Sequence, residues 1–311
     1  MLSPKLSPEM RGFLEAAASQ GGPAIESLPA PEARQVAHHL KPLGGEPEPV
    51  AQIADRKVLG RSGEIPIRVY APDGDGPFPG VVFLHGGGWV LCDLDTHDTI
   101  CRAISKRAGC VVVAVDYRLA PEHKFPAALD DCFDVTRWVA SNAPALRIDP
   151  KRLVLAGDSA GGNMATVIAS KSRNGGPSVA LQVLVYPVIN MTSFDTPSHR
   201  EFPEGHFVTR SSMEWFKSNY FSSASDTRNP DASPYFIENL NGMPPALVLT
   251  AECDPLRDEG EAYAKRLQAS GTAVTLTRYD GMIHPFLNFM GISAGAQKAI
   301  DQIAAAVRAL Q

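Results

Sequence analysis

The sequence of 311 residues predicts an α/β fold, with a mostly parallel eight-stranded sheet, helices on both of its faces, and a helical cap. Two observations predict it: short apolar strands alternate with amphipathic helical stretches, and two long segments match neither strand nor sheet-covering helix. The strands are expected at residues 52–58, 65–70, 80–84, 111–116, 152–156, 181–186, 246–251 and 274–279. The helices that cover the sheet are expected at residues 96–108, 126–142, 160–173, 257–270 and 294–310.

The two remaining segments are predicted to form the cap. The first, residues 1–50, is rich in proline and has short helical patches, and the second lies between two strands and contains a helix candidate at 211–221. Long insertions of this kind beside a functional site usually act as lids. We therefore expect a helical cap from residues 1–50 and 188–225, and a catalytic domain from residues 51–187 and 226–311.

The segment GDSAG at residues 157–161 has the G-x-S-x-G form, in which a serine sits on a sharp turn between a strand and a helix. We expect a strained backbone at Ser159, and we expect that a β-carbon at Gly157 or Gly161 would collide with a neighbouring element. Asp158 is interpreted as hydrogen-bonding scaffold. The motif alone is weak evidence, because composition produces it in about one such chain in ten.

A second motif, HGGGW at residues 85–89, directly follows an apolar strand. Backbone N–H groups of such a glycine loop can hold the oxygen that becomes negative when a serine attacks a carbonyl. A chance match is rare, at roughly one chain in several hundred. The two motifs together indicate nucleophilic catalysis by a serine.

A serine hydroxyl becomes a good nucleophile when a base removes its proton. In strand–turn–helix sites of this type the chain order is serine, then acid, then histidine. His284 follows the last expected strand and is the candidate base for Ser159. Asp254 follows the seventh strand and is the candidate acid, with Glu252 left open as a substitute, whereas Asp258 falls on the next helix. His97 shows no partner pattern, so a surface or structural role is favoured for it.

These segments resemble the hormone-sensitive-lipase group of α/β-hydrolase esterases, with its many bacterial carboxylesterases. The resemblance runs from residue 81 to 286 and includes DYRLAPE at 116–122 and DPLRDEG at 254–260. It implies that Ser159 is the nucleophile, Asp254 the orienting acid and His284 the base. It also implies an oxyanion hole formed by the N–H groups of Gly87, Gly88 and Ala160, with Gly86 as second choice. Pro285 departs from the family pattern, which usually has glycine there.

Large apolar side chains in the glycine loop and the insertion are candidates for the wall of the substrate pocket. They are Trp89, Phe202, Phe207, Met213, Trp215 and Phe216. The alternative, that each of them only joins the cap to the body, stays open.

The resemblance implies a carboxylesterase that acts through an acyl-serine intermediate, and the expected cap predicts that its acyl esters are of short to medium chain length. An amide-type hydrolase, either an arylformamidase or a deacetylase, could use the same residues and stays open. A non-catalytic ligand-binding member of the fold is disfavoured, because such proteins typically lose a residue of the triad.

The resemblance implies a small-molecule ester as partner, and composition disfavours other classes of partner. The net charge of −5 argues against nucleic acid, and the chain has no apolar run of 18 residues to span a membrane. The five cysteines show no metal-ligand spacing, so neither a metal nor a cofactor is expected. Their odd number and the lack of a signal pattern predict reduced thiols and a cytoplasmic location. A homodimer stays open as the assembly.

Overall fold

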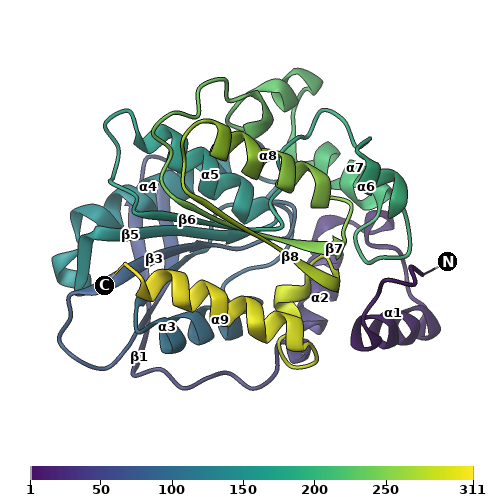
Figure 1. Cartoon of the computed structure of the whole chain (residues 1–311), viewed down its shortest axis with the longest axis horizontal. Coiled ribbons are helices and arrows are strands. Elements are labelled where there is room, and N and C mark those ends of the chain that lie inside the picture. Colours follow the sequence, from purple (N-terminus) through teal and green to yellow (C-terminus); the bar gives the residue numbers. More distant parts are fainter. Residues whose placement is uncertain (1, 311) are drawn as a thin grey trace.

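The computed structural model describes residues 2–310, and an eight-stranded sheet runs through their centre (Figure 1). Its strands are β1 (Gln52–Gly60), β2 (Gly63–Ala71), β3 (Phe78–Leu84), β4 (Val111–Val115), β5 (Ile148–Asp158), β6 (Leu181–Val185), β7 (Ala246–Cys253) and β8 (Val274–Ile283). The order across the sheet is β1-β2-β4-β3-β5-β6-β7-β8. β2 pairs antiparallel with β1 and β4, and every other neighbouring pair is parallel. The predicted mostly parallel sheet is therefore confirmed.

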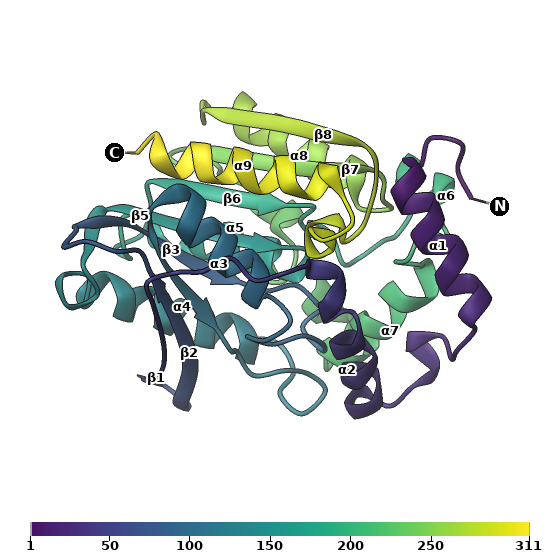
Figure 2. The ribbon, with the colours of Figure 1, turned by 90° about the horizontal axis from the view of Figure 1, so that it is seen from below.

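Helices cover both faces of this sheet. One face carries α3 (Asp98–Ala108) and α9 (Ala294–Arg308), and the other carries α4 (Ala127–Ser141), α5 (Ala160–Ser172) and α8 (Arg257–Ala269) (Figures 1 and 2). The strands between them are apolar at successive positions because both of their faces are buried. In β4, for example, Val111 and Val113 belong to the core under α4 and α5, whereas Val112 and Ala114 belong to the core under α3 and α9.

The remaining helices gather at one end of the sheet. They are α1 (Pro8–Gln20), α2 (Ala30–His39), α6 (Pro197–Glu201) and α7 (Arg210–Tyr220), and both ribbon views place them there (Figures 1 and 2). Short 3₁₀ turns complete the fold at Ile25–Ser27, Lys41–Gly44, Pro144–Leu146, Ala224–Arg228, Pro234–Phe236 and Phe286–Phe289. Segments from the N-terminus and from the insertion therefore lie together, which supports the predicted division into cap and catalytic domain. That division stays a prediction.

The last strand is longer than its sequence pattern indicated. The alternation stops near residue 279, but β8 continues to Ile283. Gly281 accommodates the extension with a φ of +71°, and the pairing of β7 with β8 shifts register after Ala251 before Cys253 meets Ile283. His284 therefore leaves the sheet directly at the end of β8, beside the end of β7.

The cysteines Cys92, Cys101, Cys110, Cys132 and Cys253 are all free thiols, as expected. Within residues 2–310, no helix combines the length and the apolar character needed to cross a bilayer.

Candidate active site

Ser159 occupies the turn between β5 and α5 in a conformation that non-glycine residues rarely adopt, with φ 55° and ψ −117°. The flanking glycines make this turn possible. A β-carbon built at Gly157 would lie 2.7 Å from the Leu84 carbonyl oxygen, and one at Gly161 would collide with that same carbonyl. The expected strain and the expected collisions are both present, so the strand ends on a tight elbow that presents the hydroxyl.

The structure brings the three predicted triad residues into one chain of hydrogen bonds. Ser159 Oγ lies 3.0 Å from His284 Nε2, and His284 Nδ1 lies 3.0 Å from Asp254 Oδ2. All three side chains are buried. The second oxygen of Asp254 accepts the N–H of Leu256 at 2.8 Å, which fixes the carboxylate in its plane. This arrangement suits proton transfer from the serine to the imidazole.

Glu252, the alternative acid, has a different contact. Its Oε2 accepts the backbone N–H of Gly281 at 2.9 Å, so it joins the end of β7 to β8. Asp254 is therefore the carboxylate that the structure places on His284.

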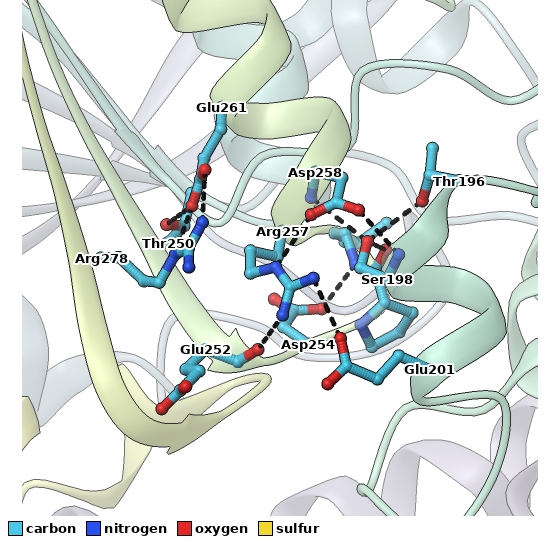
Figure 3. Close-up of polar contacts among 12 residues, drawn as sticks. Thr196, Ser198, Glu201, Thr250, Glu252, Asp254, Arg257, Asp258, Glu261 and Arg278 are labelled. Atoms are coloured by element: carbon cyan, nitrogen blue, oxygen red, sulfur yellow. Dashed lines mark hydrogen bonds and ion pairs between the residues drawn. The ribbon is translucent and has the colours of Figure 1, made fainter. Parts of the chain in front are cut away.

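The loop that carries Asp254 is bound to the insertion through a buried guanidinium (Figure 3). Arg257, 7% exposed, donates to the Glu252 carbonyl at 2.8 Å, to Asp258 Oδ1 at 2.8 Å and to Glu201 Oε2 at 3.1 Å. Asp258 in turn accepts the N–H of Ser198 in α6 at 2.7 Å. The residues after Asp254 are therefore held to β7 through the Glu252 carbonyl and to α6 through Glu201 and Ser198.

The glycine loop closes the other side of the site. Gly87 and Gly88 have φ values of 101° and 60°, which favour glycine, and the Gly87 carbonyl accepts the N–H groups of Val90 and Leu91. The N–H of Gly86 donates to Asp158 Oδ1 at 2.9 Å. Because this N–H is already engaged, Gly86 is less suited to the oxyanion hole than its two successors.

His85 and Tyr117 support the loop from behind. Their rings stack with centroids 4.1 Å apart, and the Tyr117 hydroxyl donates to the His85 carbonyl at 2.8 Å. Burial and the neighbouring His97 lower the pKa of His85 to about 4. His85 is therefore uncharged at neutral pH and acts as scaffold.

Of the six pocket candidates, Phe216 contacts the glycine loop, because a β-carbon at Gly88 would collide with its ring. Trp215 packs edge-on against Phe216, with ring centroids 5.2 Å apart. Trp89 is buried and stacks on Tyr220 at 4.3 Å. These contacts support a wall position for Phe216 and a packing role for Trp89.

The other three candidates have contacts that join segments of the fold. Phe202 is buried, and the guanidinium carbon of Arg257 lies over its ring, 5.5 Å from the ring centroid. Phe207 packs against Phe289, with centroids 5.9 Å apart, and Met213 belongs to the core. The pocket assignment of these three stays a prediction.

Sequence reasoning missed Tyr186, which lies directly after β6. Its buried ring lies 4.5 Å from the His284 ring, centroid to centroid, at an interplanar angle of 57°. The available signal was its place at the carboxyl end of a central strand, where the ends of the other parallel strands also meet.

Comparisons with known proteins agree with this fold. A family model described as the alpha/beta hydrolase fold matches residues 81–288. The carboxylic ester hydrolase LipN of Mycobacterium tuberculosis is 41% identical over 270 residues, 85% of this chain and 72% of that protein. The ethyl acetate hydrolase of Pseudomonas putida is 37% identical over 317 residues, 98% of each. The hyperthermophilic esterase from the archaeon Pyrobaculum calidifontis has a TM-score of 0.93 at 43% identity, with 98% of each chain covered.

The sheet and the serine–histidine–aspartate arrangement define an α/β hydrolase. The chain belongs to the family that the matching model describes, and the resemblance to hormone-sensitive-lipase-like esterases seen in its motifs is confirmed.

Proposed function

We propose that Ser159 is the nucleophile, His284 the general base and Asp254 the residue that orients it in the hydrolysis of a carboxylic ester. The observation that carries this proposal is the chain of hydrogen bonds from Ser159 Oγ through the imidazole to Asp254 Oδ2, with 3.0 Å at each step. The protein is a serine carboxylic-ester hydrolase, and its substrates are small molecules.

Acylation begins when Ser159 Oγ attacks the ester carbonyl and its proton passes to His284 Nε2. The carbonyl oxygen becomes negative and accepts the N–H groups of Gly87, Gly88 and Ala160. Ala160 suits this role because the first N–H groups of a helix have no partner within the helix. The tetrahedral intermediate then collapses, the carbon–oxygen bond to the alcohol breaks, and His284 returns the proton to the departing oxygen.

Deacylation repeats these steps with water. His284 takes a proton from the water as its oxygen attacks the acyl-serine, and the proton then goes to Ser159 Oγ as the acid leaves. Asp254 stays ionised throughout and stabilises the imidazolium that forms twice per turnover.

The acyl group is proposed to be of short to medium length. The Ser159 side chain is buried, and Phe216 contacts the glycine loop beside it. The acyl carbons next to the reacting carbonyl would therefore contact protein and not solvent. A cap built from residues 1–50 and 188–225 would enclose that space.

Matched p-nitrophenyl esters and p-nitroanilides of graded acyl length test this function. Ester turnover with little anilide turnover at each length is the expected result. Anilide turnover at comparable rates would instead favour the amide-hydrolase alternative, because an amide needs protonation of a poorer leaving group.

A further inference from the structure

Asp158, the residue before the nucleophile, is a buried carboxylate behind the glycine loop. It is 1% exposed, and its Oδ1 accepts the Gly86 N–H at 2.9 Å. The approach is so close that a β-carbon at Gly86 would lie 2.5 Å from Asp158 Oδ2. The carboxylate therefore links the strand that ends in the nucleophile to the loop that supplies two of the proposed oxyanion donors.

The second neighbour of this carboxylate is His97, which directly precedes α3 and is also buried. His97 Nε2 lies 3.2 Å from Asp158 Oδ1. The other ring nitrogen, Nδ1, lies 3.0 Å from Thr96 Oγ1, whose own proton is directed to the Asp93 carbonyl at 2.8 Å. These contacts fix the ring of His97 beside the Asp158 carboxylate.

The surroundings favour the ionised form of the carboxylate. Burial alone would raise the pKa of the Asp158 carboxyl, but His97 beside it holds that pKa below its ordinary value. The ring centroid of His85 is 5.5 Å from that of His97, and the pKa of His85 is lowered to about 4 by burial and by His97. A buried carboxylate is tolerated when it is paired and hydrogen-bonded, and Asp158 is both.

We propose that Asp158, held in place by its contact with His97, positions the oxyanion loop for attack by Ser159. The inference rests on the proposed function, because it concerns the loop assigned to the oxyanion hole. Asp158 is a positioning residue that acts through Gly86 and so sets the direction of the following N–H groups. His97 holds the carboxylate in place through its contact with Oδ1.

Removing the carboxylate should reduce stabilisation of the transition state more than it reduces binding of the substrate. Loss of one oxyanion-hole donor costs about 10²- to 10³-fold in kcat, so Asp158→Ala is expected to lose about 100-fold in kcat while KM changes less than about threefold. Asp158→Asn keeps an oxygen that can accept the Gly86 N–H. We therefore expect it to recover most of this loss and to stay within about tenfold of the parent kcat.

A matched control separates positioning from general loss of stability. The Tyr263 hydroxyl and Thr166 Oγ1 are buried 3.0 Å apart in the core, so Tyr263→Phe also removes one buried hydrogen bond. Circular dichroism measures the thermal unfolding temperature of Tyr263→Phe. The kcat of this variant should match the parent value even if that temperature is lower. If Asp158→Ala does not fold, His97→Gln decides, with an expected loss of about tenfold in kcat at unchanged KM.

An Asp158→Ala enzyme within threefold of the parent kcat would overturn the proposal.

Ser159→Ala distinguishes failure of this inference from failure of the proposed function. If Ser159→Ala is inactive while Asp158→Ala turns over like the parent, the positioning role is wrong and the nucleophile assignment stands. If Ser159→Ala keeps its ester turnover, the proposed function itself is wrong.

Discussion

The ring of Phe216 lies against the main chain of Gly88, so closely that a β-carbon at Gly88 would collide with it. This contact joins α7 of the insertion to the loop assigned to the oxyanion hole. Because the reacting carbonyl would sit beside that loop, Phe216 is placed to meet the first carbons of the acyl or alcohol group.

Phe216→Ala should therefore move the chain-length preference towards longer or bulkier acyl groups. Each added methylene stabilises the bound ester by at most about 0.8 kcal/mol while it contacts apolar side chains of the pocket. Methylenes beyond the end of the pocket gain nothing, so the parent kcat/KM is expected to peak at roughly C4 to C8. The measurement is kcat/KM on p-nitrophenyl esters of graded length. Tyr235→Ala serves as the control, because Tyr235 is 52% exposed and packs on Phe236. An unchanged profile in Phe216→Ala would remove this residue from the pocket wall.

The proposed cap over the site also predicts little activation at a lipid surface. A lipase that works on droplets presents a large apolar surface to them. In this protein the nucleophile Ser159 is buried. Rates on an ester series should rise smoothly up to the solubility limit, and emulsified long-chain triglyceride should be a poor substrate. A jump in rate when droplets form would instead show an open, lipid-binding face.

Asp254→Asn is expected to leave the protein folded and to lower kcat by up to about 10⁴-fold, because an amide cannot hold the imidazole in the required tautomer. Glu252→Gln is the matched control, since its side chain contacts the Gly281 N–H and not His284. It should cost less than about tenfold. A larger loss in Glu252→Gln than in Asp254→Asn would show that Glu252 is the orienting acid.

Glu259 predicts a pH dependence of stability. Its Oε1 accepts the Ile189 N–H at 2.7 Å, and burial raises its pKa from 4.5 to about 8. Between these values the native state holds a proton that the unfolded state has released, so stability declines as pH rises, by about 1.4 kcal/mol per pH unit. Glu259→Gln cannot ionise. Its free energy of unfolding relative to the parent should rise between about pH 5 and pH 8 in urea denaturation, and a constant difference would contradict the raised pKa.

Much of the fold and the three triad residues could be predicted because their signals are local. The elbow at Ser159 needs glycines at fixed offsets, and strand–helix alternation places the ends of parallel strands at one edge. His284 and Asp254 each follow an expected strand, so chain order made them candidates. The choice between Asp254 and Glu252 required the structure, because both come after the strand expected at residues 246–251.

The rest depends on side chains that meet across long sequence separations. Nothing in the sequence pattern near His97 indicates that it meets Asp158, and the Tyr186 contact with His284 likewise joins two strand ends. The aromatic candidates show the same limit. Phe207 and Phe216 look alike as residues of the insertion, but one packs on Phe289 and the other on Gly88.

The nucleophile is the central claim, and covalent labelling tests it most directly. A p-nitrophenyl alkylphosphonate should react once, with a bond formed between Ser159 Oγ and phosphorus as p-nitrophenolate leaves. Peptide mass spectrometry should then place the phosphonyl group on Ser159, and Ser159→Ala should take up no label and lose at least about 10⁴-fold in kcat. A label on another residue, or ester turnover that survives in pure Ser159→Ala protein, would contradict the claim.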